Sequence, residues 1–221
     1  RALRPHWRNF FEDGMVVDLH PDPAEMAAQA EKAGEKTENV EAFLEYSAKL
    51  YDLIDHGYFE KGLDTPSDFA KHYGLWAFRN FDLLHSMHGG VSKRINSPYL
   101  RDIFDFFIKY VGSSAHRAPA FMNCLPTIQF RHDLWYVDGG MYNIARGLEK
   151  LMEATGVRTH YGSEVVAIDI ASNEKVRGVT LRDGRTVAAD TVVCNMEVVP
   201  AYRNLLGEDV EFMRTLERFE P

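Results

Sequence analysis

The hydrophobic positions of this chain follow two rhythms, one up to about residue 130 and another after it. In segment 39–59, Phe43, Tyr46 and Leu50 recur at the spacing of one helix face, as do Leu53 and Ile54. Beyond residue 132, short apolar runs alternate with glycine-containing turns, which is typical of strands. The pattern predicts a mainly helical region over 20–130, followed by mixed helix and sheet.

Start and stop signals place the elements of the helical region. Thr65 and Pro66 predict a helix start, with Thr65 as N-cap and Asp68 at the third position. This helix is expected to continue, with a kink at Gly74, through Trp76, Phe78 and Leu83. Ser97-Pro98 predicts the start of another helix, with Pro98 again at the first helical position, and Gly112 predicts its end. The other predicted elements are a hairpin over 8–20, helices over 24–32 and 39–59, and a helix or turn over 118–130.

The segment 97–111 carries the widest apolar stripe of the chain, made of Leu100, Ile103, Phe104, Phe107, Ile108 and Val111. Such a stripe is typical of a core helix. Two alternatives stay open from the sequence: the wall of a tunnel for an apolar ligand, and a surface that contacts a membrane.

The second region begins with a predicted strand over His132–Val137 and the glycine pair Gly139-Gly140, which permits a tight turn before a helix. Gly156 is expected to end that helix. The remaining predicted elements are the helix 141–155, extended segments 157–160 and 164–170, a hairpin over 175–188, a buried-type strand 191–194, and helix from 202 that resumes over 210–219.

Composition excludes several function classes. The 221 residues are 45% hydrophobic and carry a net charge of −8, which argues against a nucleic-acid partner. Cys124 and Cys194 lie far apart, which favours a reducing compartment without a disulfide framework. His85 and His88 share a helical spacing but lack a third ligand, so no metal site is predicted. No run of about 18 apolar residues occurs.

A family resemblance emerges from an ordered set of motifs. These are Trp135–Gly140, Met141–Leu148, Gly156–Arg158, Glu164–Ile168, Gly178–Gly184 and Ala189–Asn195. The set resembles the middle of the bacterial carotenoid (phytoene and diapophytoene) desaturases, FAD-dependent flavoproteins of the amine-oxidase-like superfamily.

The resemblance implies part of a two-domain flavoprotein of the α+β or α/β class. Residues 1–137 would form a mainly helical substrate and membrane-binding region with sheet strands, 138–197 part of the FAD-binding domain, and 198–221 a return to the substrate region. The sequence has no GxGxxG turn for the cofactor pyrophosphate. We therefore expect an internal piece of a longer enzyme that by itself is inactive and does not retain FAD.

The resemblance also implies cofactor-binding residues. Val165 matches the position whose backbone pairs with the adenine of FAD, and Asn195 ends a segment that passes close to the cofactor. Gly139 and Gly140 would allow close approach of flavin or substrate. Each position has a plainer alternative: a buried strand valine, a strand end and a tight turn.

Asp68 and Lys71 are the acid–base candidates. They are three residues apart and face the same side of a helix. In some members of the resembled family, an acid–base pair at the corresponding place is thought to assist desaturation, although Lys71 stands where a relative has arginine. The alternative is a first-turn carboxylate that caps the helix, with a solvated lysine beside it.

The implied function is dehydrogenation of a linear C30 or C40 polyene such as phytoene or diapophytoene, by a cytoplasmic enzyme peripherally associated with membrane. Alternatives are a carotenoid isomerase, a retinol saturase or an amine oxidase of the same superfamily, or a non-enzymatic module that binds apolar ligands or membranes. An amine substrate would require a carboxylate cluster or an aromatic cage, and the sequence predicts neither.

Overall fold

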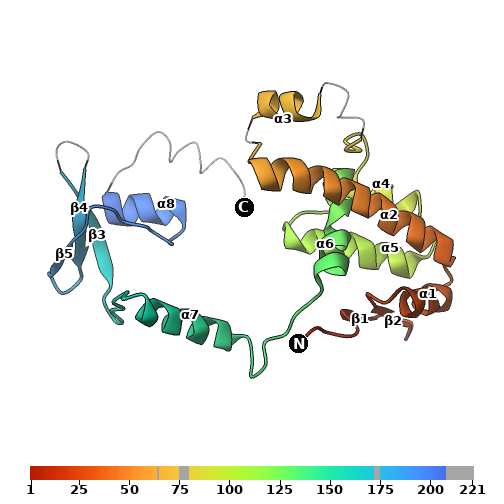
Figure 1. The fold of residues 1–221 in the computed structure, drawn as a ribbon, viewed down its shortest axis with the longest axis horizontal. Coiled ribbons are helices and arrows are strands. Elements are labelled where there is room, and N and C mark those ends of the chain that lie inside the picture. Colours follow the sequence, from red (N-terminus) through yellow and green to blue (C-terminus); the bar gives the residue numbers. More distant parts are fainter. Residues whose placement is uncertain (64, 75–79, 172–174, 208–221) are drawn as a thin grey trace. The chain divides into compact units, whose positions relative to one another are not determined.

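The computed structural model describes residues 1–63, 65–74, 80–171 and 175–207. The chain divides into two compact units, Arg1–Arg146 and Gly147–Pro221, and the boundary falls inside helix α7 (Tyr142–Ala154). The first unit is mainly helical with a two-stranded hairpin, and the second contains a three-stranded sheet (Figure 1). This combination confirms the predicted α+β class.

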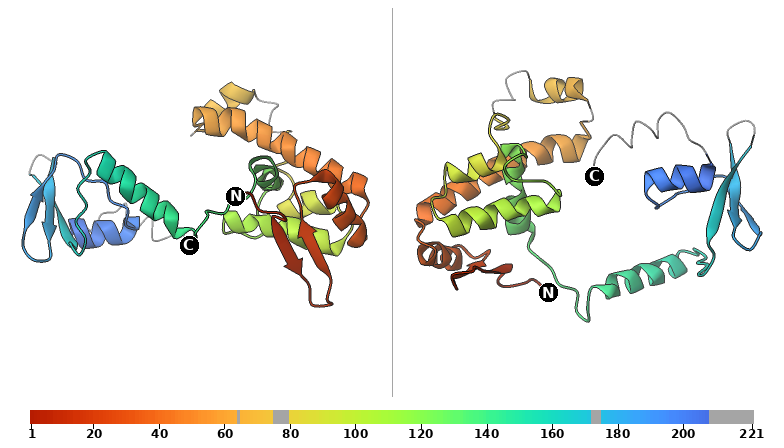
Figure 2. Two further views of the ribbon diagram at one scale, coloured as in Figure 1. Left: turned by 60° about the horizontal axis from the view of Figure 1, so that its bottom comes forward. Right: turned by 180° about the vertical axis from the view of Figure 1, so that it is seen from behind.

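The chain begins with the predicted hairpin and helix. Strands β1 (Trp7–Phe10) and β2 (Val16–Leu19) pair antiparallel, and Gly14 adopts φ 85° in the turn between them (Figure 2). Asp22 then caps α1 (Pro23–Lys32), since its carboxylate accepts hydrogen bonds from two backbone N–H groups of the first turn. The hairpin therefore leads directly into the helical part of the unit.

Helix α2 (Thr37–Ile54) is the longest helix described, and a π-helical turn over Asp55–Phe59 extends it. Its predicted apolar face is confirmed, because Phe43 and Leu50 are buried. This face packs against the 3-10 helix Ala120–Cys124 and α6 (Leu125–His132).

Helix α3 (Pro66–Tyr73) is capped as predicted, with the backbone N–H of Asp68 donating to Thr65 Oγ1 at 3.2 Å. Its predicted continuation is wrong, because Gly74 ends the helix with φ 77°. Leu83 lies in a turn, whereas Trp76 and Phe78 lie outside the described residues.

Helix α4 (Met87–Ser92) was not predicted from the sequence. Its two adjacent glycines lower the helix propensity of the segment, and tertiary packing compensates. A Cβ on Gly90 would lie 2.5 Å from Asn123 Nδ2 and 3.0 Å from the Tyr46 hydroxyl. Gly90 is therefore a point of close packing between α4 and its neighbours.

Helix α5 (Pro98–Asp105) and the 3-10 helix η3 (Phe106–Tyr110) carry the wide apolar stripe. Phe104, Phe107 and Ile108 are buried in the main hydrophobic cluster, so the structure supports the core interpretation of the stripe. Ser97 precedes α5 but does not cap it through its side chain; its hydroxyl donates to the carbonyl of Ala33 at 2.6 Å.

The predicted strand over His132–Val137 is wrong. Helix α6 runs to His132, and the following residues form only an isolated bridge between Ala2 and Trp135. Backbone hydrogen bonds from Leu3 to Leu134 and from Tyr136 to Arg1 complete the contact. The segment is extended, but in the described part of the chain it pairs only with residues 1–3. This partner is too short to form a strand ladder.

The second unit contains strands β3 (Val165–Ile170), β4 (Val176–Leu181) and β5 (Thr186–Ala188), antiparallel in that order. The hairpin is confirmed. Helix α8 (Val198–Ala201) continues as a π-helical turn, Tyr202–Leu206, that contacts β3.

Two predicted extended segments do not form strands. Residues 157–160 have no assigned strand, and neither does Thr191–Cys194, in which Val193 is 91% exposed. No strand of the described residues pairs with either segment. The predicted helix over 210–219 lies outside the described residues, and the described helices include none that is long and apolar enough to cross a bilayer.

Candidate functional site

Asp68 and Lys71 lie on α3, and their charged atoms are 4.0 Å apart. Their side chains are 43% and 79% exposed. The hydroxyl of Thr65 donates to Asp68 Oδ2 at 2.5 Å while accepting from the Asp68 backbone N–H at 3.2 Å. This reciprocal geometry is that of a helix cap. The two side chains thus lie close together, exposed to solvent, at the start of α3.

The turn at Gly139 and Gly140 precedes α7. Both glycines have positive φ, 81° and 103°, which an L side chain adopts only with strain. Asn143 closes the turn by donating from Nδ2 to the carbonyl of Asp138 at 2.9 Å, and a Cβ on Gly139 would lie 2.6 Å from that nitrogen. A tight turn therefore requires Gly139, whereas the space around a Cβ on Gly140 is open.

Val165 is the first residue of β3, at the edge of the sheet, and pairs with Leu181. An edge strand has one side facing away from its neighbour, where backbone groups can pair with a planar ligand. Asn195 is exposed and lies in irregular structure, one residue before a bend. A hollow of about 870 Å³ on this unit is lined by residues of all three strands and Leu206, but neither Val165 nor Asn195 borders it.

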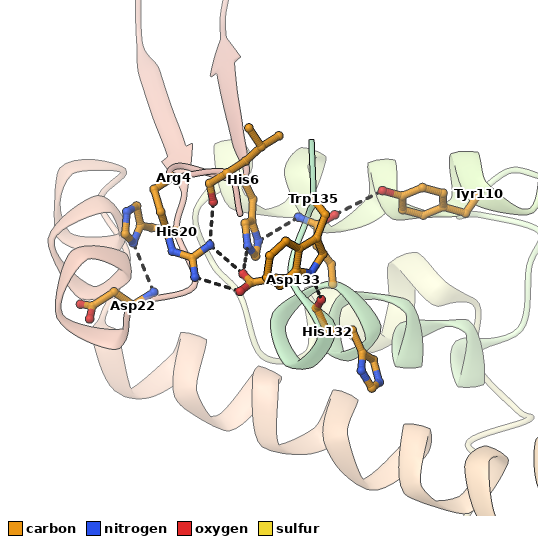
Figure 3. Close-up of polar contacts among 10 residues, drawn as sticks. Arg4, His6, His20, Asp22, Tyr110, His132, Asp133 and Trp135 are labelled. Atoms are coloured by element: carbon orange, nitrogen blue, oxygen red, sulfur yellow. Dashed lines mark hydrogen bonds and ion pairs between the residues drawn. The ribbon is translucent and has the colours of Figure 1, made fainter. Parts of the chain in front are cut away.

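A partly buried polar cluster in the first unit was missed by the sequence reasoning (Figure 3). Asp133, just after α6, accepts two hydrogen bonds from the guanidinium of Arg4, at 2.7 and 2.9 Å. It also lies 2.7 Å from Nε2 of His6, whose side chain is fully buried. Hydrogen bonds from Arg4 and then His6 lower the pKa of Asp133 to about 2. The cluster joins residues that are more than 120 positions apart in the chain.

The hydrogen bonds of this cluster run in one direction. Tyr110 donates to Gln129 Oε1 at 3.2 Å, and the amide nitrogen of Gln129 lies 3.3 Å from His6 Nδ1. Because Gln129 Nε2 can only donate, His6 Nδ1 accepts and the ring proton is on Nε2, facing Asp133. The tautomer of His6 thus follows from its partners.

Asp133 has φ 66° and ψ 170°, a backbone region that is essentially restricted to glycine. Strain of this kind costs about 1–3 kcal/mol and persists only where surrounding contacts hold it. Here Arg4 and His6 provide those contacts. The cluster therefore sets the direction in which the chain leaves α6 toward Gly139.

The two histidines considered as metal ligands are each engaged by protein groups. His85 lies 2.5 Å from Asp82 through Nδ1 and 2.7 Å from the Lys93 ammonium through Nε2. His88 lies 2.6 Å from Asp105 and 3.0 Å from Ser92. No group of three or more potential metal ligands was found among the described residues.

Comparison with known proteins places these features in a family. The profile of the flavin containing amine oxidoreductases matches residues 6–219. The chain belongs to this family. It is 44% identical over 223 residues to 4,4'-diapolycopene oxygenase of Methylomonas sp, covering 100% of this chain and 45% of the relative. It is 41% identical over 221 residues to 4,4'-diaponeurosporene oxygenase of Staphylococcus aureus, covering 98% of this chain and 44% of the relative.

These relatives confirm the resemblance to carotenoid-modifying flavoproteins. The chain spans less than half the length of the two relatives. Because the family is flavin containing, the residues of this chain can be compared with the contacts that FAD requires. The edge of β3 at Val165 suits a planar adenine, and the open space at Gly140 suits close approach by a ligand. Within the second unit Val165 would contact the adenine, and within the first unit Gly139 and Gly140 would permit a separate close approach.

Proposed function

We propose that this chain is part of an FAD-dependent oxidoreductase that acts on a linear carotenoid precursor. The observation that carries the proposal is the identity of 44% and 41% to two enzymes whose names both specify a 4,4'-diapo carotenoid. Both alignments run through all or nearly all of this chain. A linear C30 polyene is the substrate class that follows.

The residues of this chain would bind and orient, while bound FAD would supply the electron-accepting chemistry. The backbone of Val165 would hold the adenine at the edge of β3, and Asn195 would lie beside the cofactor. Gly139 and Gly140 would let the chain approach flavin or substrate closely. The exposed Asp68–Lys71 pair would act on a substrate proton only if the polyene passes along α3.

Two oxidations of such a polyene are possible. The family resemblance implies desaturation, which removes two hydrogen atoms at each step. The names of the two relatives favour oxygenation instead, and we therefore place oxygenation of a C30 carotenoid ahead of desaturation. Because a polyene of either kind dissolves in lipid, we further propose that the enzyme works at a membrane surface.

The test uses the complete protein that carries this sequence, purified with FAD and supplied with diapophytoene or diapolycopene in lipid vesicles. Mass spectrometry separates the two reactions, since desaturation lowers the mass by two hydrogens and oxygenation adds oxygen. A product from either polyene supports the proposal, and the mass change decides between the reactions. Consumption of neither polyene, together with oxidation of an amine, would overturn it in favour of an amine oxidase.

A further inference from the structure

Three aromatic rings of the first unit surround one ammonium group. The Nζ atom of Lys109 lies 3.7 Å from the ring centroid of Trp7, 4.4 Å from that of Phe106 and 5.1 Å from that of Tyr110. All three distances are within the range of a cation–π interaction. The rings of Trp7 and Phe106 meet at 74°, so they form two walls of a corner.

The corner has a rigid back and an open front. Trp7, from β1, packs at 4.5 Å between centroids against Phe107, which is fully buried in the core. Tyr110 is held through its hydroxyl, which donates to Gln129 of the polar cluster. Phe106 and Tyr110 are each 55% exposed, so their rings remain accessible from solvent.

Lys109 occupies this corner without an ion-pair partner among the described residues. Its interactions in the described structure are ring contacts, and no carboxylate of the described residues lies within 4.0 Å of its ammonium. Burial lowers the pKa of Lys109. A primary ammonium is also strongly hydrated and sits on a flexible four-carbon stem. It can therefore swing into water and leave the rings free.

Rings arranged in this way suit a cation of another kind. A quaternary ammonium group has a fixed charge, carries no N–H group that needs a hydrogen-bond acceptor, and binds to aromatic cages through cation–π contact. We propose that Trp7, Phe106 and Tyr110 form an aromatic cage for an external quaternary ammonium group, and that Lys109 is the internal cation that such a ligand displaces. The source of the group is either a free choline-type molecule or the headgroup of a choline lipid.

The cage is tested on the complete protein that carries this sequence, with choline as the probe. Nuclear magnetic resonance follows the indole N–H signal of Trp7, which is assigned by its loss in Trp7→Leu. We expect choline to shift this signal with millimolar affinity, and Lys109→Met to tighten binding about three- to tenfold by removing the internal competitor. The uncharged isostere 3,3-dimethylbutan-1-ol should bind more weakly than choline and gain nothing from Lys109→Met.

Matched variants separate the cage from general effects. Phe106→Leu, at an exposed wall, should weaken choline binding in the Lys109→Met background even if Trp7→Leu fails to fold. Trp135→Leu, at an exposed tryptophan outside the cage, should leave it unchanged. If choline shifts the Trp7 signal in neither the parent chain nor Lys109→Met, or if the isostere binds equally well, the proposal is overturned.

Vesicles distinguish the two sources of the ligand. Co-sedimentation with phosphatidylcholine but not phosphatidylglycerol vesicles, lost in Phe106→Leu, would assign the cage to a lipid headgroup. Choline binding without vesicle binding would assign it to a soluble ligand. Equal binding to both kinds of vesicle, without any response to choline, would show that apolar contact and not ammonium recognition is at work, and would overturn the proposal. None of these outcomes depends on flavin or polyene turnover.

Discussion

Replacing Glu35 with glutamine is expected to destabilise the first unit by about 3 kcal/mol at neutral pH. Glu35 lies between α1 and α2 and is only 5% exposed. Its Oε1 atom accepts from the Lys36 backbone at 2.9 Å and from the Asn39 amide at 2.7 Å, and its Oε2 atom accepts from the backbones of Asn96 and Ser97. One carboxylate thus joins the start of α2 to the segment that precedes α5.

The magnitude follows from the pKa of Glu35. Burial by itself would raise this pKa, but the hydrogen bonds, that from Ser97 first, outweigh burial and lower it from 4.5 to about 2. Such a decrease corresponds to about 3 kcal/mol in favour of the folded protein with the carboxylate ionised. A glutamine side chain would also direct an N–H₂ group at two backbone donors, leaving them unpaired.

The sign of the pH dependence is fixed by the lowered folded-state pKa. The stabilisation is complete above pH 4.5 and is lost as the pH falls toward 2. Urea unfolding of the wild type and Glu35→Gln should therefore differ by about 3 kcal/mol at pH 7 and much less near pH 2.5. Glu45→Gln, an exposed change of the same charge on α2, is the control and should change stability little. A difference between wild type and Glu35→Gln that stays constant from pH 7 to pH 2.5 would refute the reasoning.

Four further predictions concern the candidate sites. Asp133→Gly should be about 1–3 kcal/mol more stable than Asp133→Ala in urea unfolding, because both lose the Arg4 contact but only alanine retains backbone strain; equal stabilities would contradict the strain. Thr65→Ala should destabilise the chain by about 1 kcal/mol in urea unfolding, through loss of the α3 cap. Asp68→Asn should leave turnover of the complete protein unchanged. A large loss of kcat in Asp68→Asn would instead make Asp68 an acid–base group. In the complete protein, Val165→Pro should weaken FAD binding more than Val179→Pro at matched loss of stability, and equal flavin loss would remove support for an adenine contact at Val165.

Local chemistry explains what could be predicted from the sequence. The hairpin at Gly14, the capped start of α3 at Thr65 and the end of α7 at Gly156 each depend on residues within a few positions of one another. The apolar stripe that begins in α5 could likewise be predicted from the sequence. The helical period brings Phe104 and Phe107 to one face regardless of what packs on it. The sequence could not decide between core, tunnel and membrane, since that depends on tertiary neighbours.

The errors occurred where a segment takes its structure from distant partners. Residues after His132 have strand-like composition, yet extended segments become a sheet only where neighbouring strands of sufficient length exist. Helix α4 was missed for the opposite reason: its glycines argue against a helix locally, but Gly90 allows the close approach of Tyr46 and Asn123. Val165 begins β3, within the predicted extended segment, whereas Asn195 follows a segment that forms no strand. Contact of either residue with a cofactor stays a prediction.

The polar cluster and the aromatic cage share one cause for escaping sequence analysis. Arg4 and Asp133 are 129 positions apart, and no periodic pattern links them. Trp7 meets Phe106 across a comparable gap, which is why the sequence predicted no aromatic cage although its rings were all visible. Tyr110 connects the two features, since its ring lines the cage and its hydroxyl begins the chain of hydrogen bonds that ends at Asp133. The two features, far apart in the sequence, thus share one residue that neither helical nor strand periodicity would single out.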